Sequence, residues 1–120
     1  MPHLILEYSD NIPTLNCSAF FQQAHLLLAK ELPTQLSSCK SRCIVHEAFY
    51  VGDGSEQNAF AHLTIKILAG RTDEKKNYIG NELLKIMSEF FQADDSDLKT
   101  GLSVEILDLD PHYFKKQEKG

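Results

Sequence analysis

The chain has 120 residues, of which 42% are hydrophobic and 24% are charged, and its formal net charge at pH 7 is −5. This length predicts one domain over residues 1–120, and the composition argues against a disordered chain and a membrane protein, because no apolar run approaches the ~20 residues of a membrane span. The acidic balance also argues against nonspecific binding of nucleic acid, which requires a basic surface.

The chain begins with a predicted strand followed by a predicted helix. Residues 2–8 are rich in leucine and isoleucine and precede a cluster at residues 9–11 that is typical of turns. From about Ser18, apolar residues recur at helical spacing, with Asn16 or Ser18 available as the N-cap and Pro33 as the stop. We therefore expect one amphipathic helix in this stretch.

Two further strands are expected on either side of a glycine-rich turn at residues 52–55. Residues 40–51 carry β-branched and aromatic side chains, which predicts the second strand. Residues 59–69 alternate between apolar and polar side chains, so one face of this third strand is continuously apolar.

A second helix and a fourth strand complete the pattern. Thr72 is the expected N-cap of this helix, and an apolar stripe from Ile79 to Phe90 predicts the face that packs on the sheet. An acidic linker at residues 94–97 then leads to the last strand, expected at residues 102–107.

The two halves of the chain resemble each other. Residues 3–7 are similar to residues 62–66, and each segment leads into a helix and another strand. Two βαβ units explain this repeat, and they predict an α+β fold with a four-stranded mixed sheet and two helices on one face. The other face of such a sheet needs a cover, so we expect a closed homo-oligomer.

Pro2 is the first candidate for chemistry. If Met1 is removed, the Pro2 nitrogen becomes a secondary amine whose pKa starts near ~8 and falls with partial burial. A base that titrates near neutral pH suits proton transfer. The alternative stays open, because proline at position two often indicates only that methionine is removed.

Three cations are candidates for binding a carboxylate. Lys40 and Arg42 are two apart in a predicted strand, so their side chains share a face. Arg71 directly precedes the second predicted helix, where free N–H groups favour an anion. With Pro2 they form a candidate dicarboxylate site. The alternative is that Lys40 and Arg42 are solvated strand charges and that Arg71 is merely a loop residue.

Other features predict the location of the protein and argue against disulfides and a metal site. The N-terminus has no basic region before its apolar stretch, which argues against a secretory signal and predicts a cytoplasmic protein. Cys17, Cys39 and Cys43 fit neither a CxxC pair nor a zinc-ligand spacing, so we expect reduced thiols. The histidines show no spacing to a carboxylate or thiol that predicts a metal site.

Four segments carry a resemblance to a known family. They are residues 2–12 (PHLILEYSDNI), the pair at 41–42 (SR), residues 61–71 (AHLTIKILAGR) and residues 103–106 (SVEI). In these segments, and in the order of its elements, the chain resembles the 5-carboxymethyl-2-hydroxymuconate isomerase family of the tautomerase superfamily. The resemblance extends over nearly the whole chain.

The resemblance implies a homotrimer with an N-terminal proline as proton carrier and no metal or organic cofactor. It implies an isomerisation in homoprotocatechuate catabolism, which shifts a double bond in an unsaturated 2-oxo polycarboxylate. Pro2 would be the acid/base, and Arg42 and Arg71 would hold carboxylates and stabilise the dienolate. Lys40 stands where a relative has arginine. Lysine keeps the positive charge but cannot form the bidentate hydrogen bonds that arginine makes with a carboxylate, so the exact substrate stays open.

Two alternatives remain at this point. One is a tautomerase with a broader range of dienol or phenylpyruvate-type substrates. The other is an oligomeric binding module that recognises an acidic metabolite through the same cations without turning it over.

Overall fold

The computed structural model describes residues 1–13, 15–91 and 97–119. Its elements, in chain order, are β1 (His3–Ser9), α1 (Cys17–Glu31), the 3-10 helix η1 (Leu36–Ser38), β2 (Lys40–His46), β3 (Asn58–Ile67), α2 (Asp73–Phe90) and β4 (Lys99–Asp108). All four predicted strands and both predicted helices are present. Most of the predicted acidic linker, residues 94–96, lies outside the described residues.

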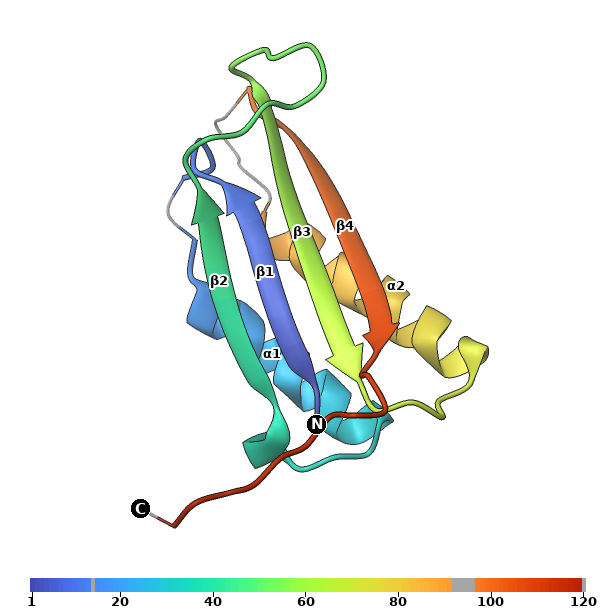
Figure 1. The fold of residues 1–120 in the computed structure, drawn as a ribbon. Coiled ribbons are helices and arrows are strands. Elements are labelled where there is room, and N and C mark those ends of the chain that lie inside the picture. The colour runs from blue at the N-terminus through green and yellow to red at the C-terminus, as the bar shows by residue number, and fades with distance from the viewer. Residues whose placement is uncertain (14, 92–96, 120) are drawn as a thin grey trace.

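The four strands form one mixed sheet in the order β2-β1-β3-β4. The β1–β2 and β3–β4 pairs are parallel, as expected for two βαβ units, and β1 joins β3 in antiparallel pairing. The two similar sequence segments therefore lie side by side, with His3 opposite Lys66 and Glu7 opposite His62. Figure 1 shows both helices on the same side of this sheet, which confirms the predicted fold.

Side chains cap both helices where the sequence predicts it. The Asn16 side chain accepts a hydrogen bond from the Ala19 amide (3.0 Å), and the Thr72 hydroxyl accepts one from the Lys75 amide (3.1 Å). Each cap satisfies an N–H group that has no partner within the helix. Helix α1 ends at Glu31, two residues before Pro33, which cannot continue it.

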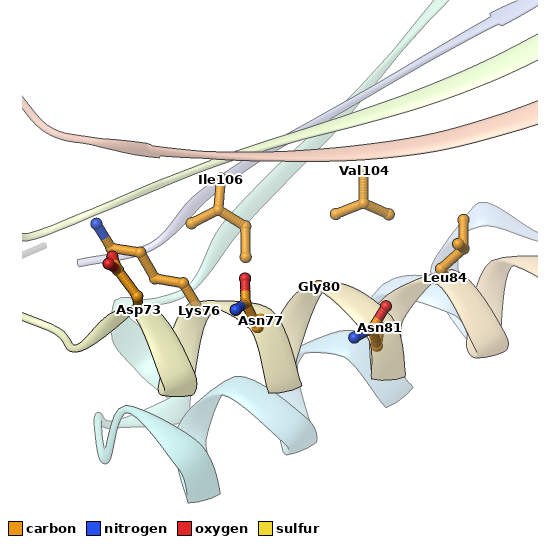
Figure 2. A pocket seen from close by; sticks show the side chains of 8 residues that line it. All are labelled: Asp73, Lys76, Asn77, Gly80, Asn81, Leu84, Val104 and Ile106. Carbon is orange, nitrogen blue, oxygen red and sulfur yellow. The ribbon is translucent and has the colours of Figure 1, made fainter.

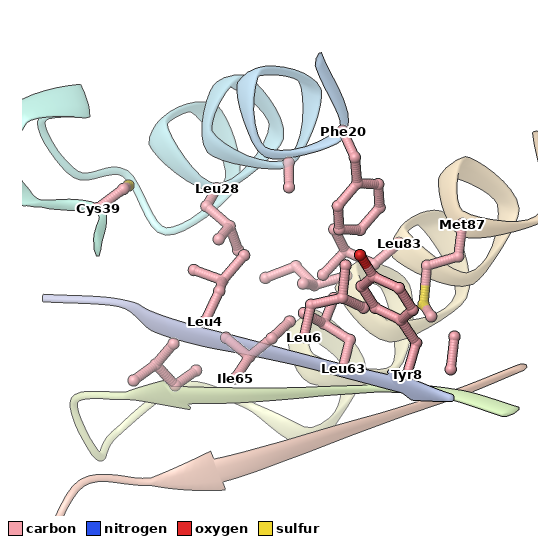
Figure 3. Packing of buried hydrophobic residues seen from close by; sticks show 14 of the residues in the cluster. Leu4, Leu6, Tyr8, Phe20, Leu28, Cys39, Leu63, Ile65, Leu83 and Met87 are labelled. Atoms are coloured by element: carbon pink, nitrogen blue, oxygen red, sulfur yellow. The ribbon is translucent and has the colours of Figure 1, made fainter. Parts of the chain in front are cut away.

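The core lies between the helices and the inner sheet face. Alternate residues of β1 and β3 point into it, and every second residue of β3 from Ala59 to Ile67 is buried. Figure 3 shows these side chains meeting those of the helices. The fully buried residues labelled there are Leu4, Leu6, Phe20, Leu28, Leu63, Ile65, Leu83 and Met87.

Strand β2 is shorter than the sequence predicts, because it ends at His46 and not at residue 51. In the described part of the sheet its neighbour is β1, which ends at Ser9 opposite His46, so no described strand pairs with the chain beyond. The apolar residues that suggested a longer strand serve other contacts. Phe49 packs edge-on against Phe60, and Tyr50 lies in the loop with 79% of its surface exposed.

The outer face of the sheet has no helix over it and carries mostly polar and charged side chains. Contacts between a histidine and a carboxylate link neighbouring strands across it, from His46 Nε2 to Glu7 Oε1 (3.0 Å) and from His62 Nε2 to Glu105 Oε1 (3.4 Å). Ile44, at 45% exposure, is a large apolar residue among them. This outer face is therefore less apolar than the face that packs on the helices.

Candidate active site

Pro2 lies immediately before β1 with its side chain fully buried. Its carbonyl accepts a hydrogen bond from the Lys40 amide (3.1 Å), which fixes the amino terminus against the start of β2. Burial lowers the pKa of the Met1 amine below its ordinary value of 8.0, and the nearby cations Lys115, Arg71 and Lys40 lower it further. With Met1 present, the Pro2 nitrogen is an amide and cannot act as a base.

Arg71 is held in place by backbone carbonyls. Its guanidinium donates hydrogen bonds to the carbonyl of Leu32, at the end of α1 (3.0 Å), and to that of Leu68 (3.3 Å). Because both acceptors are uncharged, these bonds orient the side chain without neutralising it. The cation therefore acts on the amino terminus with its full charge.

Lys40 and Arg42 share the outer face of β2, as the sequence predicts. Lys40 lies beside the amino terminus, whereas Arg42 lies next to His3, with its Nη1 atom 3.3 Å from His3 Nδ1. Within one protomer the structure thus brings Lys40 and Arg71 close to the amino terminus, next to Pro2. Arg42 lies two residues further along β2, beside His3.

A cavity of about 470 Å³ opens at this amino terminus. Its lining includes Met1 and Lys40. It continues along the C-terminal segment, residues 109–117, which contributes Tyr113, Lys115 and Lys116. Among the described residues that line it there are three lysines and no aspartate or glutamate. A cavity with only positive charge, in a chain whose net charge is −5, is suited to binding an anion.

Sequence reasoning missed the contribution of the C-terminal segment. Residues 111–120 are polar and basic, and no periodicity relates them to Pro2. Only the fold shows that β4 ends close to the start of β1, so that the following residues pass the amino terminus (Figure 1). The signal in the sequence was the pair Lys115-Lys116 near the end of an acidic chain.

The chain matches the model of the 5-carboxymethyl-2-hydroxymuconate isomerase family over residues 2–119. It belongs to this family. The 5-carboxymethyl-2-hydroxymuconate Delta-isomerase of Escherichia coli is 32% identical to it over 118 residues, which are 98% of this chain and 94% of the relative. The chain is therefore an isomerase.

Solved structures agree with membership of the 5-carboxymethyl-2-hydroxymuconate isomerase family. A 5-carboxymethyl-2-hydroxymuconate isomerase from Deinococcus radiodurans R1 is 31% identical and superposes with a TM-score of 0.86, covering 98% of this chain and 90% of that one. A fused 4-OT symmetric trimer, 18% identical, has a TM-score of 0.69 over 89% of this chain and 85% of its own, and shares the fold.

A second cavity of this isomerase, of about 530 Å³, lies between α2 and β4. Figure 2 shows Asn77 and Asn81 of α2 facing Ile106 and Val104 of β4 across it. Its lining includes none of the four residues predicted for the site. The cavity at the amino terminus, by contrast, is lined by Lys40 and by Met1, the residue before Pro2.

Over residues 1–13, 15–91 and 97–119, no three histidine, cysteine or acidic side chains are grouped so that they could hold a metal ion. Neither described helix has the length and apolar character needed to cross a membrane.

Proposed function

We propose that this isomerase moves a proton in an unsaturated 2-oxo polycarboxylate, as a 5-carboxymethyl-2-hydroxymuconate Delta-isomerase, with the Pro2 nitrogen as acid and base. The observation that carries the proposal is the cavity at the amino terminus, whose charged lining residues are all cations. Such a cavity attracts a polycarboxylate, and its cations lower the pKa of a terminal amine beside it.

In the proposed mechanism, removal of Met1 frees the Pro2 secondary amine. This amine takes a proton from the substrate and returns it to another carbon, so that no proton is lost overall. Arg71 and Arg42 hold carboxylates and stabilise the negative charge that develops on the dienolate oxygen. Lys40 adds a positive charge beside the amine, and neither a metal nor an organic cofactor takes part.

We also propose that the protein works as a homotrimer. Support comes from the symmetric trimers among proteins of the same fold and from the exposed apolar residue Ile44 on the outer face of the sheet. Arg42 lies on this face, so in an assembly it would lie near a neighbouring protomer. The proposal includes a place in cytoplasmic homoprotocatechuate catabolism, which would supply the substrate.

The variant Pro2→Ala tests the proton-transfer role. It retains a primary amine at the same place, so substrate binding should persist while kcat falls by about 10²-fold or more. Pro13→Ala is the matched control, because Pro13 is an exposed proline. The measured mass of the purified protein must also show that Met1 has been removed.

A second form of the enzyme tests the amine itself. A chain with an uncleaved N-terminal extension has an amide nitrogen at Pro2 and should be inactive while it still assembles. Full activity in either form would overturn the proposal. A panel of enols with one, two and three carboxylates should show the highest kcat/KM for the tricarboxylate, and a preference for phenylpyruvate would indicate a broader tautomerase instead.

A further inference from the structure

The C-terminal segment, residues 109–117, passes directly over the amino terminus (Figure 1). The Leu109 amide donates to the Ile67 carbonyl (2.7 Å), which extends the pairing with β3 by one residue, and the Tyr113 amide donates to the Asp110 carbonyl (3.0 Å). These backbone bonds turn the chain back toward β1. The segment thus has a defined path across the cavity.

Tyr113 anchors this segment to β1. Its hydroxyl lies 2.8 Å from His3 Nε2, and the two rings meet edge-on with their centres 5.7 Å apart. Arginine has no acceptor, so Arg42 donates to His3 Nδ1, and the neutral histidine carries its proton on Nε2. His3 therefore donates to the Tyr113 oxygen, and the contact connects Arg42 with the C-terminal segment.

The two lysines that follow differ in their partners. Lys116 pairs with Glu118 (3.2 Å), and both side chains are exposed. Lys115 has no ion-pair partner among the described residues, and of all the charged groups it has the strongest effect on the terminal amine. An unpaired cation beside a cavity without acidic residues is available to bind an anionic ligand.

We propose that Lys115 binds one carboxylate of the substrate and that Tyr113, through its bond to His3, positions it over the amino terminus. This inference rests on the proposed function, because it names a further binding residue of the same site. Lys115 would thereby contribute to selectivity for substrates with several carboxylates. Tyr113 is a positioning residue, since it acts through the path of the segment.

Steady-state kinetics of Lys115→Met test whether Lys115 binds a carboxylate of the substrate. For 5-carboxymethyl-2-hydroxymuconate, KM should rise about tenfold or more, as expected when a charge-assisted hydrogen bond is lost. For a monocarboxylate enol, the rise in KM should be smaller. Loss of the cation should also raise the pKa of the amine, so the acid limb of the kcat/KM profile moves to higher pH. Lys115→Arg should restore most of the binding.

Lys119→Met is the matched control, because it removes the same charge at an exposed residue that lies just beyond this segment and outside the cavity. It should leave KM and the pH profile unchanged. Equal effects of Lys115→Met and Lys119→Met would overturn the inference, since they would indicate only a general loss of positive charge. So would a Lys115→Met enzyme that behaves as the wild type.

Binding of tricarballylate, an unreactive tricarboxylate, separates this inference from the proposed function. Calorimetry should give a weaker affinity for Lys115→Met than for wild type, whether or not either form turns over substrate. An inactive wild type with this difference would overturn only the isomerase proposal, and an active wild type without it would overturn only the role of Lys115.

Tyr113→Phe tests the positioning role. It removes the hydroxyl that binds His3 and retains the ring, so KM should rise while kcat changes little. The His3 ring resonances should shift in the NMR spectrum of the variant. An unchanged KM together with shifted resonances would show that the contact exists but does not position Lys115.

Discussion

Lys40, Arg71 and Lys115 act together on one amine. They come from the start of β2, the loop before α2 and the C-terminal segment, and each lowers the pKa of the amino terminus. A cation near an amine disfavours its protonated form, and burial acts in the same direction. The lowered pKa of this amine therefore results from residues far apart in the sequence.

His3 gives a prediction about pH and stability. Burial and the cations Arg42 and Lys40 lower its pKa in the folded protein below the ordinary value of 6.5. The unfolded chain therefore binds a proton more readily, so the stability that neutral His3 provides is present above pH 6.5 and is lost as the pH falls below it. The free energy of unfolding should decrease between about pH 7 and pH 5.

Chemical denaturation of wild type and His3→Gln, at one protein concentration, measures this effect. The variant should show a shallower decrease with falling pH. Comparison of the two slopes is necessary because burial also lowers the pKa of His25, which remains in both proteins. Identical slopes would contradict the role assigned to His3.

The candidate site could be predicted from the sequence only in part. Pro2, Arg42 and Arg71 lie in segments that resemble one family, and Lys40 directly precedes one of these segments. The structure places Lys40 and Arg71 near the amino terminus in one protomer. Lys115 could not be predicted, because its place depends on where β4 ends. Such a long-range consequence of sheet order leaves no periodic signal in the chain.

Helix α1 provides a test of the core at the scale of one element. Leu28 is fully buried on its inner face, whereas Leu26, two residues earlier, is 54% exposed. Leu28→Ala should lower the free energy of unfolding by about 2–5 kcal/mol, since it removes buried apolar surface and leaves a cavity. Leu26→Ala should change it by less than about 0.5 kcal/mol.

Urea unfolding followed by circular dichroism measures both variants. Similar losses for the two leucines would contradict the packing of α1 on the sheet.

The elements differ in how well their sequence predicts them. Caps and apolar spacing locate both helices, because these signals depend on residues within one or two turns. The end of β2 was predicted wrongly, since a strand stops where its partner stops and Ser9 is the last residue of β1 opposite it. Strand ends depend on pairing, which the local sequence does not contain.

The outer face of the sheet gives a prediction about the whole molecule. If it packs against other protomers, Ile44→Glu should dissociate the trimer, because it places a buried carboxylate in the same sheet row as Glu7. Leu26→Glu, on α1 in the other layer, is the matched control and should remain trimeric. Light scattering after size-exclusion chromatography distinguishes the two outcomes.

A trimeric Ile44→Glu would show that another surface forms the assembly. A monomeric wild type would contradict the trimer altogether.

The pairing of the strands and the placement of the helices in the whole chain could be predicted best from the sequence. Two similar βαβ segments predict the parallel pairs and the single helical layer, and the antiparallel β1–β3 pair at the centre joins the two units. The connection places the start of β1 beside the end of β3, where the C-terminal segment also begins. The position of the site at this end of the sheet follows from that pairing.

Titration of ¹⁵N-labelled Pro2 by NMR is the most direct test of the central claim. In the purified enzyme without Met1, we predict that the Pro2 nitrogen titrates with a pKa below the 8.0 of an ordinary amino terminus, because Pro2 is buried and because Lys115, Arg71 and Lys40 lower the pKa of the adjacent Met1 amine. A pKa at or above that value, or a nitrogen that does not titrate because it is still acylated, would contradict the account.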